Sequence, residues 1–118
     1  MKIYQVFVMA TIEKNNDLYT IVLHFDVKPE SQQVHLDDLI EFFESIVSKQ
    51  SGLVSTNFHK SLDGTKILNY TQWESKEDWN NAIRNKEVLN HPKNPIKHVK
   101  VHVQDYEVAY TFNKNNSE

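Results

Sequence analysis

Two strand-like stretches flank the dipeptide Asp63-Gly64, and together they predict a β-hairpin. Leu53–Ser61 precedes the dipeptide and Lys66–Glu74 follows it, and both contain several of the β-branched and aromatic side chains that favour strands. Asp-Gly is a strong turn signal between two such stretches, because glycine readily adopts the positive φ of a tight turn. The hairpin commits the chain to an antiparallel sheet, which the remaining elements must extend and cover.

The other elements are predicted from the periodicity of apolar residues. Apolar side chains recur at helical spacing over Leu36–Val47 and predict an amphipathic helix that ends near Gln50. Ser75 is suited to cap the start of a second helix. Three further strands are expected, at Ile3–Glu13, Leu18–Lys28 and His98–Phe112.

The predicted order of elements is β-β-α-β-β-α-β. Without the first strand it is βαββαβ, the pattern of a ferredoxin-like α+β fold in which an antiparallel sheet carries helices on one face. The other face needs a cover, and a second copy of the chain is the simplest one, which predicts a homodimer. The chain has 118 residues, so residues 1–112 are expected to form a single domain and residues 113–118 a polar, disordered tail.

Charge and residue usage exclude several classes of protein. The formal net charge is −3, and the densest basic run, Lys93–Lys100, is interrupted by uncharged residues, which argues against binding to nucleic acid. The chain has no cysteine, which excludes thiol nucleophiles, cysteinyl metal sites and disulfides and fits a reducing compartment. No window approaches membrane-spanning length, and no signal peptide is recognised. We therefore expect a cytoplasmic protein with neither nucleic acid nor membrane as a partner.

The histidines do not predict a metal site. His98 and His102 are four residues apart, but the alternating valines around them indicate a strand, in which four residues span about 13 Å. Two ligands of one zinc ion must each lie about 2 Å from it, so this pair cannot chelate. Gly52 and Gly64 are the only glycines, which leaves no glycine-rich loop for a phosphate. Neither a metal nor a nucleotide cofactor is expected.

Asn69 and Trp73 are the first candidates for a ligand site. They lie four residues apart in one predicted strand, so their side chains share a face. An amide and an indole N–H that face into a small domain are suited to bind an oxygen-bearing ligand. The alternative is that Trp73 is a core residue and that Asn69 bonds to a neighbouring loop.

His59 is a candidate proton acceptor whose position depends on the turn. A two-residue loop at Asp63-Gly64 places Phe58 opposite Asn69. A three-residue loop with a bulge at Gly64 places His59 opposite Ile67, on the face of Asn69. In the second arrangement His59 would act as a base. The alternative is a partly exposed strand histidine without a role.

Two runs of residues in and after the predicted hairpin carry a resemblance to a known family. They are His59-Lys60-Ser61-Leu62-Asp63-Gly64-Thr65 and Asn69-Tyr70-Thr71-Gln72-Trp73-Glu74-Ser75. The segment that contains them resembles the signature of the antibiotic biosynthesis monooxygenase (ABM) family, with a looser likeness over Tyr19–Phe112. The resemblance implies a ferredoxin-like domain whose dimer joins two sheets into an α/β barrel.

The resemblance also implies a reaction. Family members that oxidise polycyclic phenols to quinones use no metal, flavin or haem; the substrate anion passes an electron to dioxygen, and a peroxy intermediate collapses to the quinone. By that analogy Asn69 would stabilise the oxyanion and Trp73 would donate to the peroxy group. Phe43, Trp79 and Ile83 would wall the cavity. The implied function is a cofactor-independent monooxygenase of a small phenolic or quinol-like compound, with a small aromatic ligand and molecular oxygen as partners.

Other functions on the same fold stay open. In haem-degrading relatives the tryptophan position falls on Ala82 here and the histidine position on Pro92, beside His91, which disfavours haem degradation. A non-catalytic small-ligand-binding or stress-response dimer needs only an apolar pocket. An isomerase or degradation enzyme for a small carbonyl metabolite would use the same cavity, and a structural dimer with a filled core would have none.

Overall fold

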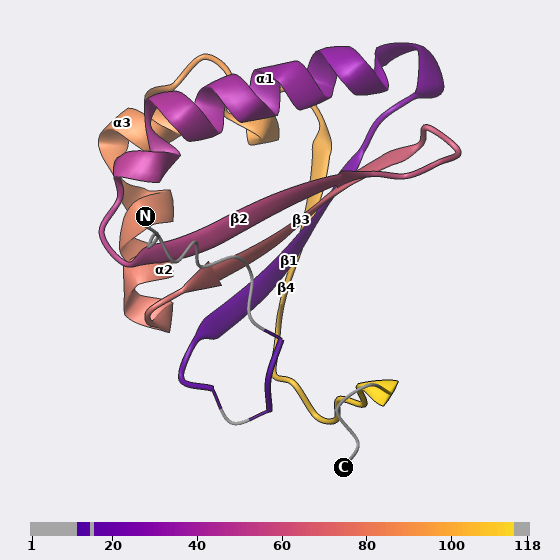
Figure 1. Ribbon diagram of the computed structural model, residues 1–118. Helices are drawn as coiled ribbons and strands as arrows, with labels where there is room; N and C mark the ends of the chain where they lie inside the picture. The colour runs from indigo at the N-terminus through magenta and orange to yellow at the C-terminus, as the bar shows by residue number, and fades with distance from the viewer. Residues whose placement is uncertain (1–11, 15, 115–118) are drawn as a thin grey trace, which may run out of the picture.

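The predicted hairpin is extended by two more strands into one antiparallel sheet. The computed structural model describes residues 12–14 and 16–114, so the expected strand at Ile3–Glu13 falls almost entirely outside the described residues. The strands lie in the spatial order β2-β3-β1-β4, and each neighbouring pair is antiparallel. Their bounds are β1 (Tyr19–Asp26), β2 (Leu53–Lys60), β3 (Lys66–Trp73) and β4 (Lys100–Tyr106). This order is that of the predicted ferredoxin-like fold (Figure 1).

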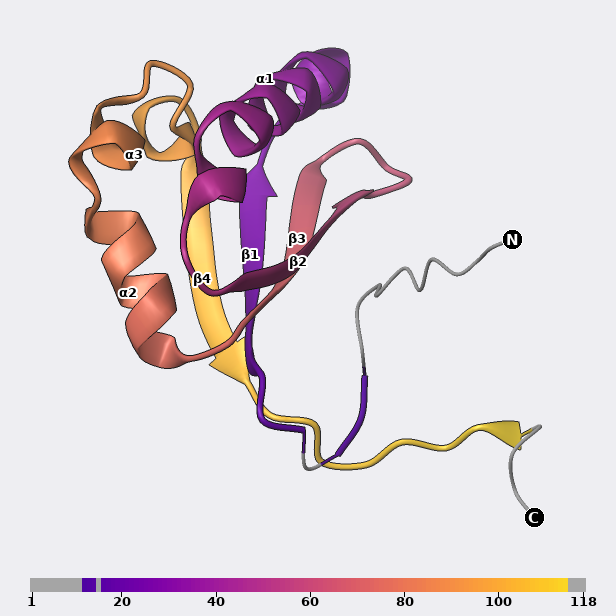
Figure 2. The ribbon, with the colours of Figure 1, turned by 60° about the vertical axis from the view of Figure 1, so that its left-hand side comes forward.

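The helices lie together on one face of the sheet (Figure 2). Between β1 and β2 the chain forms a 3₁₀ turn at Pro29–Ser31, helix α1 (Gln32–Ser45) and a second 3₁₀ turn at Val47–Lys49. Between β3 and β4 it forms α2 (Lys76–Arg84), α3 (Lys86–Asn90) and a 3₁₀ turn at Pro95–Lys97. The first predicted helix therefore ends as an α-helix at Ser45 and continues toward Gln50 as a tighter turn.

The start of α2 is held by the predicted cap. The Ser75 hydroxyl accepts a hydrogen bond from the Asp78 backbone N–H at 3.0 Å and donates to the Asp78 carboxylate at 2.9 Å. This satisfies a backbone donor that the first helical turn leaves free. The Asp78 side chain packs against Gly52, whose φ is +88° and at which a Cβ would overlap the carboxylate. The loop before β2 and the start of α2 are thereby packed together.

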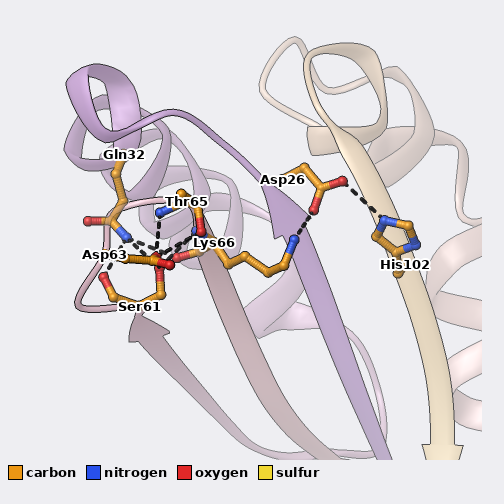
Figure 3. A network of polar contacts seen from close by, with 7 residues as sticks. All are labelled: Asp26, Gln32, Ser61, Asp63, Thr65, Lys66 and His102. Carbon is orange, nitrogen blue, oxygen red and sulfur yellow. Dashed lines mark hydrogen bonds and ion pairs between the residues drawn. The ribbon is translucent and has the colours of Figure 1, made fainter.

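A polar network holds the hairpin tip to the start of α1 (Figure 3). Asp63 Oδ1 accepts hydrogen bonds from the Thr65 backbone N–H at 3.0 Å, the Thr65 hydroxyl at 2.8 Å and the Ser61 hydroxyl at 2.9 Å. Gln32 Nε2 donates to the Ser61 carbonyl at 3.1 Å and to the Lys66 carbonyl at 2.9 Å. The hydrogen bond from the Thr65 backbone N–H lowers the pKa of Asp63 the most, and the bond from the Thr65 hydroxyl lowers it further.

The last strand is shorter than the predicted His98–Phe112, because β4 ends at Tyr106. β4 pairs with β1, and Tyr106 lies opposite Thr20, one residue from the start of β1. Beyond Tyr106 only Tyr19 of β1 remains as a partner, so the pairing of the two strands stops close to the beginning of β1. The chain then leaves the sheet as an extended segment (Figure 1).

The apolar core lies between the sheet and the helices. Its buried side chains are Ile21, Phe25, Leu39, Phe42, Ile67, Trp73, Ala82 and Val88. On the opposite face of the sheet, Val22, Leu68 and Tyr70 are half-buried, and no described helix covers them (Figure 2). Within the described ranges, no helix has the length and apolar character needed to cross a bilayer.

Candidate functional site

A cavity of about 460 Å³ lies between the sheet and the helices, on the face of the sheet that carries Asn69. Most of its lining is aliphatic or aromatic. The polar lining side chains, apart from the two tryptophans, are Gln50, Thr56, Asn69, Thr71 and Asn94. None of the lining residues that the structure describes has an ionisable side chain. Such a cavity suits a small, mainly apolar ligand that carries a few polar groups.

Phe43, Trp79 and Ile83 all line this cavity. Phe43 on α1 meets Phe58 edge to face, with ring centroids 6.4 Å apart. Trp79 on α2 meets Trp73 edge to face at 5.7 Å. Ile83 is 40% exposed although it lines the cavity, so it stands where the cavity opens to solvent. The other lining residues that are also exposed are Leu89, Ile96 and Val103. The opening is therefore aliphatic.

Asn69 presents a hydrogen-bond donor to the cavity. It lies in β3, opposite Phe58 of β2, and its side chain lines the cavity wall. The Asn57 backbone N–H donates to Asn69 Oδ1 at 3.2 Å. Because a backbone N–H can only donate, this bond identifies the oxygen end of the amide. The Asn69 NH2 donates to no other residue in the described part of the chain, so it is available to an acceptor on a ligand.

The Trp73 indole N–H is already engaged. It donates to Thr71 Oγ1 at 3.1 Å, and the Trp73 side chain is 1% exposed. In this arrangement Trp73 contributes an apolar wall to the cavity. The donation to a peroxy group that the resemblance implies would require the bond to Thr71 to break.

The structure does not bring His59 to the cavity. The register pairs Phe58 with Asn69 and His59 with Leu68, as in the first of the two turn alternatives. Consecutive strand residues point to opposite faces, so His59 lies on the face away from Asn69, where it is exposed. A proton acceptor at His59 would face the side of the sheet that lacks the cavity.

Sequence reasoning missed two threonines of the site. Thr56 and Thr71 face each other across β2 and β3 with their hydroxyl oxygens 3.1 Å apart, and both line the cavity. Thr71 lies midway between Asn69 and Trp73, so the strand period alone contained the signal for it. The position of Thr56 depended on the hairpin register, which the sequence left open.

Both ring nitrogens of His91 are already hydrogen-bonded within the protein. Its Nδ1 accepts a hydrogen bond from the Lys93 backbone N–H at 3.0 Å, so the ring proton is on Nε2. Nε2 lies 3.0 Å from the Ser45 hydroxyl and therefore donates to it. His91 is thus neither a base for Ser45 nor a free ligand for an iron. Among the described residues, no cluster of histidine and carboxylate side chains is arranged to hold a metal ion.

Tyr19 and Asp105 form a hydrogen-bonded pair at the end of β1 that lies opposite Trp73. The Tyr19 hydroxyl donates to Asp105 at 2.8 Å. Burial, and then this bond, raise the pKa of Tyr19 to about 12, and the same bond lowers the pKa of Asp105. Tyr19 therefore stays protonated at neutral pH and is not a base.

Comparison with known proteins identifies the family. The antibiotic biosynthesis monooxygenase (ABM) family matches residues 18–91, more than half of the chain. The chain belongs to this family. The tetracenomycin-F1 monooxygenase of Streptomyces glaucescens is 42% identical to it over 71 residues, which are 60% of this chain. The match spans 63% of that curated relative's length.

Solved structures share the ABM fold at low sequence identity. SnoaB, a cofactor-independent oxygenase from Streptomyces nogalater, superposes with a TM-score of 0.63 at 18% identity, over 81% of this chain and 97% of SnoaB. A conserved protein from Methanosarcina mazei superposes with a TM-score of 0.65 at 15% identity, over 78% of this chain and 93% of that one. At these identities the likeness shows the fold alone.

Proposed function

We propose that this ABM protein is a cofactor-independent monooxygenase that oxidises a small phenolic or quinol-like compound in the cavity with molecular oxygen. The observation that carries the proposal is the Asn69 NH2, which is unused by other described residues and faces an apolar cavity of about 460 Å³. A donor held in such a low-dielectric site stabilises charge that develops on a substrate oxygen. The names of two similar proteins, tetracenomycin-F1 monooxygenase and a cofactor-independent oxygenase, agree with this chemistry.

The reaction begins from a substrate anion. Loss of the hydroxyl proton of the phenol leaves an oxyanion, to which Asn69 donates a hydrogen bond. Because His59 faces away from the cavity, we assign the proton acceptor to water. The anion passes one electron to dioxygen, and the two radicals combine into a peroxy species. The carbon that carries the peroxy group then loses its hydrogen as the O–O bond breaks, which gives the quinone carbonyl and hydroxide. Hydroxide takes up the proton released in the first step and becomes water.

The remaining cavity residues hold the substrate. Phe43, Trp79 and Ile83 form the apolar wall on the helix side, and Trp73 lies on the sheet side. Burial of an aromatic ring among such side chains supplies most of the binding energy of a small ligand. Trp73 would assist the peroxy step only after its N–H turns from Thr71 toward the cavity.

The protein would work as a homodimer in the cytoplasm. Val22, Leu68 and Tyr70 are half-buried on the sheet face opposite the helices, where no described helix covers them (Figure 2). A second copy packed on this face would remove these side chains from water. Joining the two sheets in this way would produce the α/β barrel expected from the family resemblance.

Oxygen uptake by the purified, metal-stripped protein tests the proposed reaction. With anthrone-like and hydroquinone substrates, Asn69→Ala should lower turnover at least ~100-fold, since it removes the donor to the oxyanion. Asn81→Ala, an exposed asparagine of α2 outside the cavity lining, is the matched control and should retain the wild-type rate. Oxygen uptake by Asn69→Ala at the wild-type rate would contradict the proposed role.

A second function, binding of a small ligand without catalysis, is favoured by one observation. The Trp73 indole N–H is bonded to Thr71, so Trp73 has no donor directed at a ligand. A binding protein needs only the apolar cavity. If the same aromatic compounds raise the melting temperature and no oxygen is consumed, the binding function is the correct one.

A further inference from the structure

The Thr71 hydroxyl uses its one proton and both of its lone pairs in hydrogen bonds within the protein. Thr71 Oγ1 accepts from the Trp73 indole N–H at 3.1 Å, and an indole N–H can only donate. The same oxygen lies 3.0 Å from the Ser55 carbonyl, which can only accept. The single proton of Thr71 is therefore directed at Ser55.

The direction of the bond between Thr56 and Thr71 follows. Their hydroxyl oxygens are 3.1 Å apart, and the Thr71 proton is already used. Thr56 must therefore donate its own proton to Thr71. The Thr56 hydroxyl then has only lone pairs left, and because Thr56 lines the cavity it presents an acceptor to a ligand.

The cavity wall thus carries an acceptor and a donor side by side. Thr56 lies opposite Thr71, and Asn69 is two residues from Thr71 along β3, so Thr56 and Asn69 are diagonal neighbours on one face. Diagonal neighbours in an antiparallel pair have Cα atoms about 7–8 Å apart. Asn69 offers N–H groups and Thr56 offers lone pairs, both toward the cavity.

We propose that Thr56 determines substrate specificity by accepting a hydrogen bond from a substrate hydroxyl, while Asn69 donates to a second oxygen of the same molecule. This inference rests on the proposed function and defines its substrate class. The substrate is an aromatic compound with two oxygen substituents, a hydroxyl that stays protonated and a phenolate or carbonyl oxygen. A phenol with one oxygen, or with an alkylated second oxygen, satisfies only Asn69.

A matched pair of ligands separates these two classes. 1,4-Dihydroxynaphthalene has a second hydroxyl, and 4-methoxy-1-naphthol replaces that hydroxyl with a methyl ether. Both tryptophans of the chain line the cavity, so quenching of their fluorescence measures binding directly. The titration is done without oxygen, so that it reports affinity whether or not the protein is an oxygenase.

The wild-type protein should bind the dihydroxy compound about tenfold more tightly than the methoxy compound, as expected for one additional hydrogen bond. Thr56→Val, which keeps the shape and removes the hydroxyl, should reduce this ratio to about one. Thr56→Ser should preserve it, and so should Thr111→Val, an exposed threonine outside the cavity. If Thr56→Val does not fold, Thr56→Ala removes the same hydroxyl.

Two results would overturn the role of Thr56. One is a wild-type protein with equal affinity, or none, for the two compounds, and the other is a Thr56→Val protein that keeps the wild-type ratio. The wild type could also show the tenfold ratio of affinities in the titration and yet consume no oxygen in the uptake assay. That result would overturn the oxygenase proposal and leave the role of Thr56 in specificity standing.

Discussion

Asn69, Thr71 and Trp73 alternate along β3 and all line the cavity, yet their hydrogen-bonding groups are used differently. Thr71 and Trp73 are buried, and the Thr71 hydroxyl accepts the Trp73 indole N–H, whereas the Asn69 amide bonds through its oxygen alone. Burial explains the difference, because a buried indole N–H without an acceptor is costly. The Asn69 NH2 faces the cavity and therefore has room for a ligand atom.

Thr71→Val tests the bond that satisfies Trp73. Valine keeps the volume of threonine and leaves the buried Trp73 N–H without its acceptor. We expect the free energy of unfolding to fall by about 1–3 kcal/mol, the cost of an unsatisfied buried donor. Chemical denaturation measures it, with Thr71→Ser as the control that retains the hydroxyl. A valine variant as stable as the serine variant would show that the bond does not contribute.

The hairpin of β2 and β3 is stabilised at its tip by the Asp63 network (Figure 3). Three hydrogen bonds from Ser61 and Thr65 converge on one carboxylate oxygen, and they hold the turn in the register that sets the faces of both strands. A one-residue slip would exchange the cavity face and the outer face. By fixing the register, the hydrogen bonds at the hairpin tip determine which side chains of β2 face the cavity.

Asp63→Ala should lower the melting temperature at neutral pH. The melting temperature of this variant should also depend less on pH in acid than that of the wild type. The pKa of Asp63 is below its ordinary value because it accepts bonds from Thr65 and Ser61. The unfolded chain therefore binds a proton at higher pH than the folded chain. The stabilisation is present above about pH 4 and is lost as the pH falls through the folded pKa.

Thermal melts between about pH 7 and pH 2 measure this effect. In Asp63→Ala the loss of stability below about pH 4 should be shallower than in the wild type. Asp63→Asn is the control, because it keeps the acceptor oxygen but has no charge to titrate. Acid sensitivity equal to that of the wild type in both variants would exclude Asp63 as a source of the pH dependence.

The described helices all cover the same face of the sheet, and none of them covers the other face (Figure 2). The cavity occupies the covered side, and Val22, Leu68 and Tyr70 occupy the other. A dimer through that second face would leave the cavity mouth at Ile83 accessible, because the two lie on opposite sides of the sheet.

Leu68→Asp should convert the proposed dimer into a monomer. It places a carboxylate on the face that the second copy would cover, and burial of an unpaired charge costs several kcal/mol. Size-exclusion chromatography with light scattering gives the mass, and circular dichroism checks the fold. Leu62→Asp is the matched control, because Leu62 is fully exposed at the hairpin tip. A dimer that persists in Leu68→Asp would place the interface elsewhere.

Much of this fold was predictable from local sequence. The two hairpin strands each end within one residue of their predicted bounds, and Ser75 caps α2 as expected. These features depend on propensity, periodicity and capping, which act between residues close together in the chain.

The sequence by itself determined the βαββαβ order, the antiparallel hairpin and the shared face of Asn69 and Trp73. Only the tertiary structure decided that His59 lies on the other face, because both turn lengths were compatible with Asp63-Gly64 and the two registers exchange the faces of β2. It also decided that β4 ends at Tyr106, opposite Thr20 and close to the beginning of β1. The bond from Trp73 to Thr71 lies within β3, but the bonds that join Thr71 to Ser55 and Thr56 cross from β2 to β3 and depend on the pairing of the two strands, which no local pattern encodes.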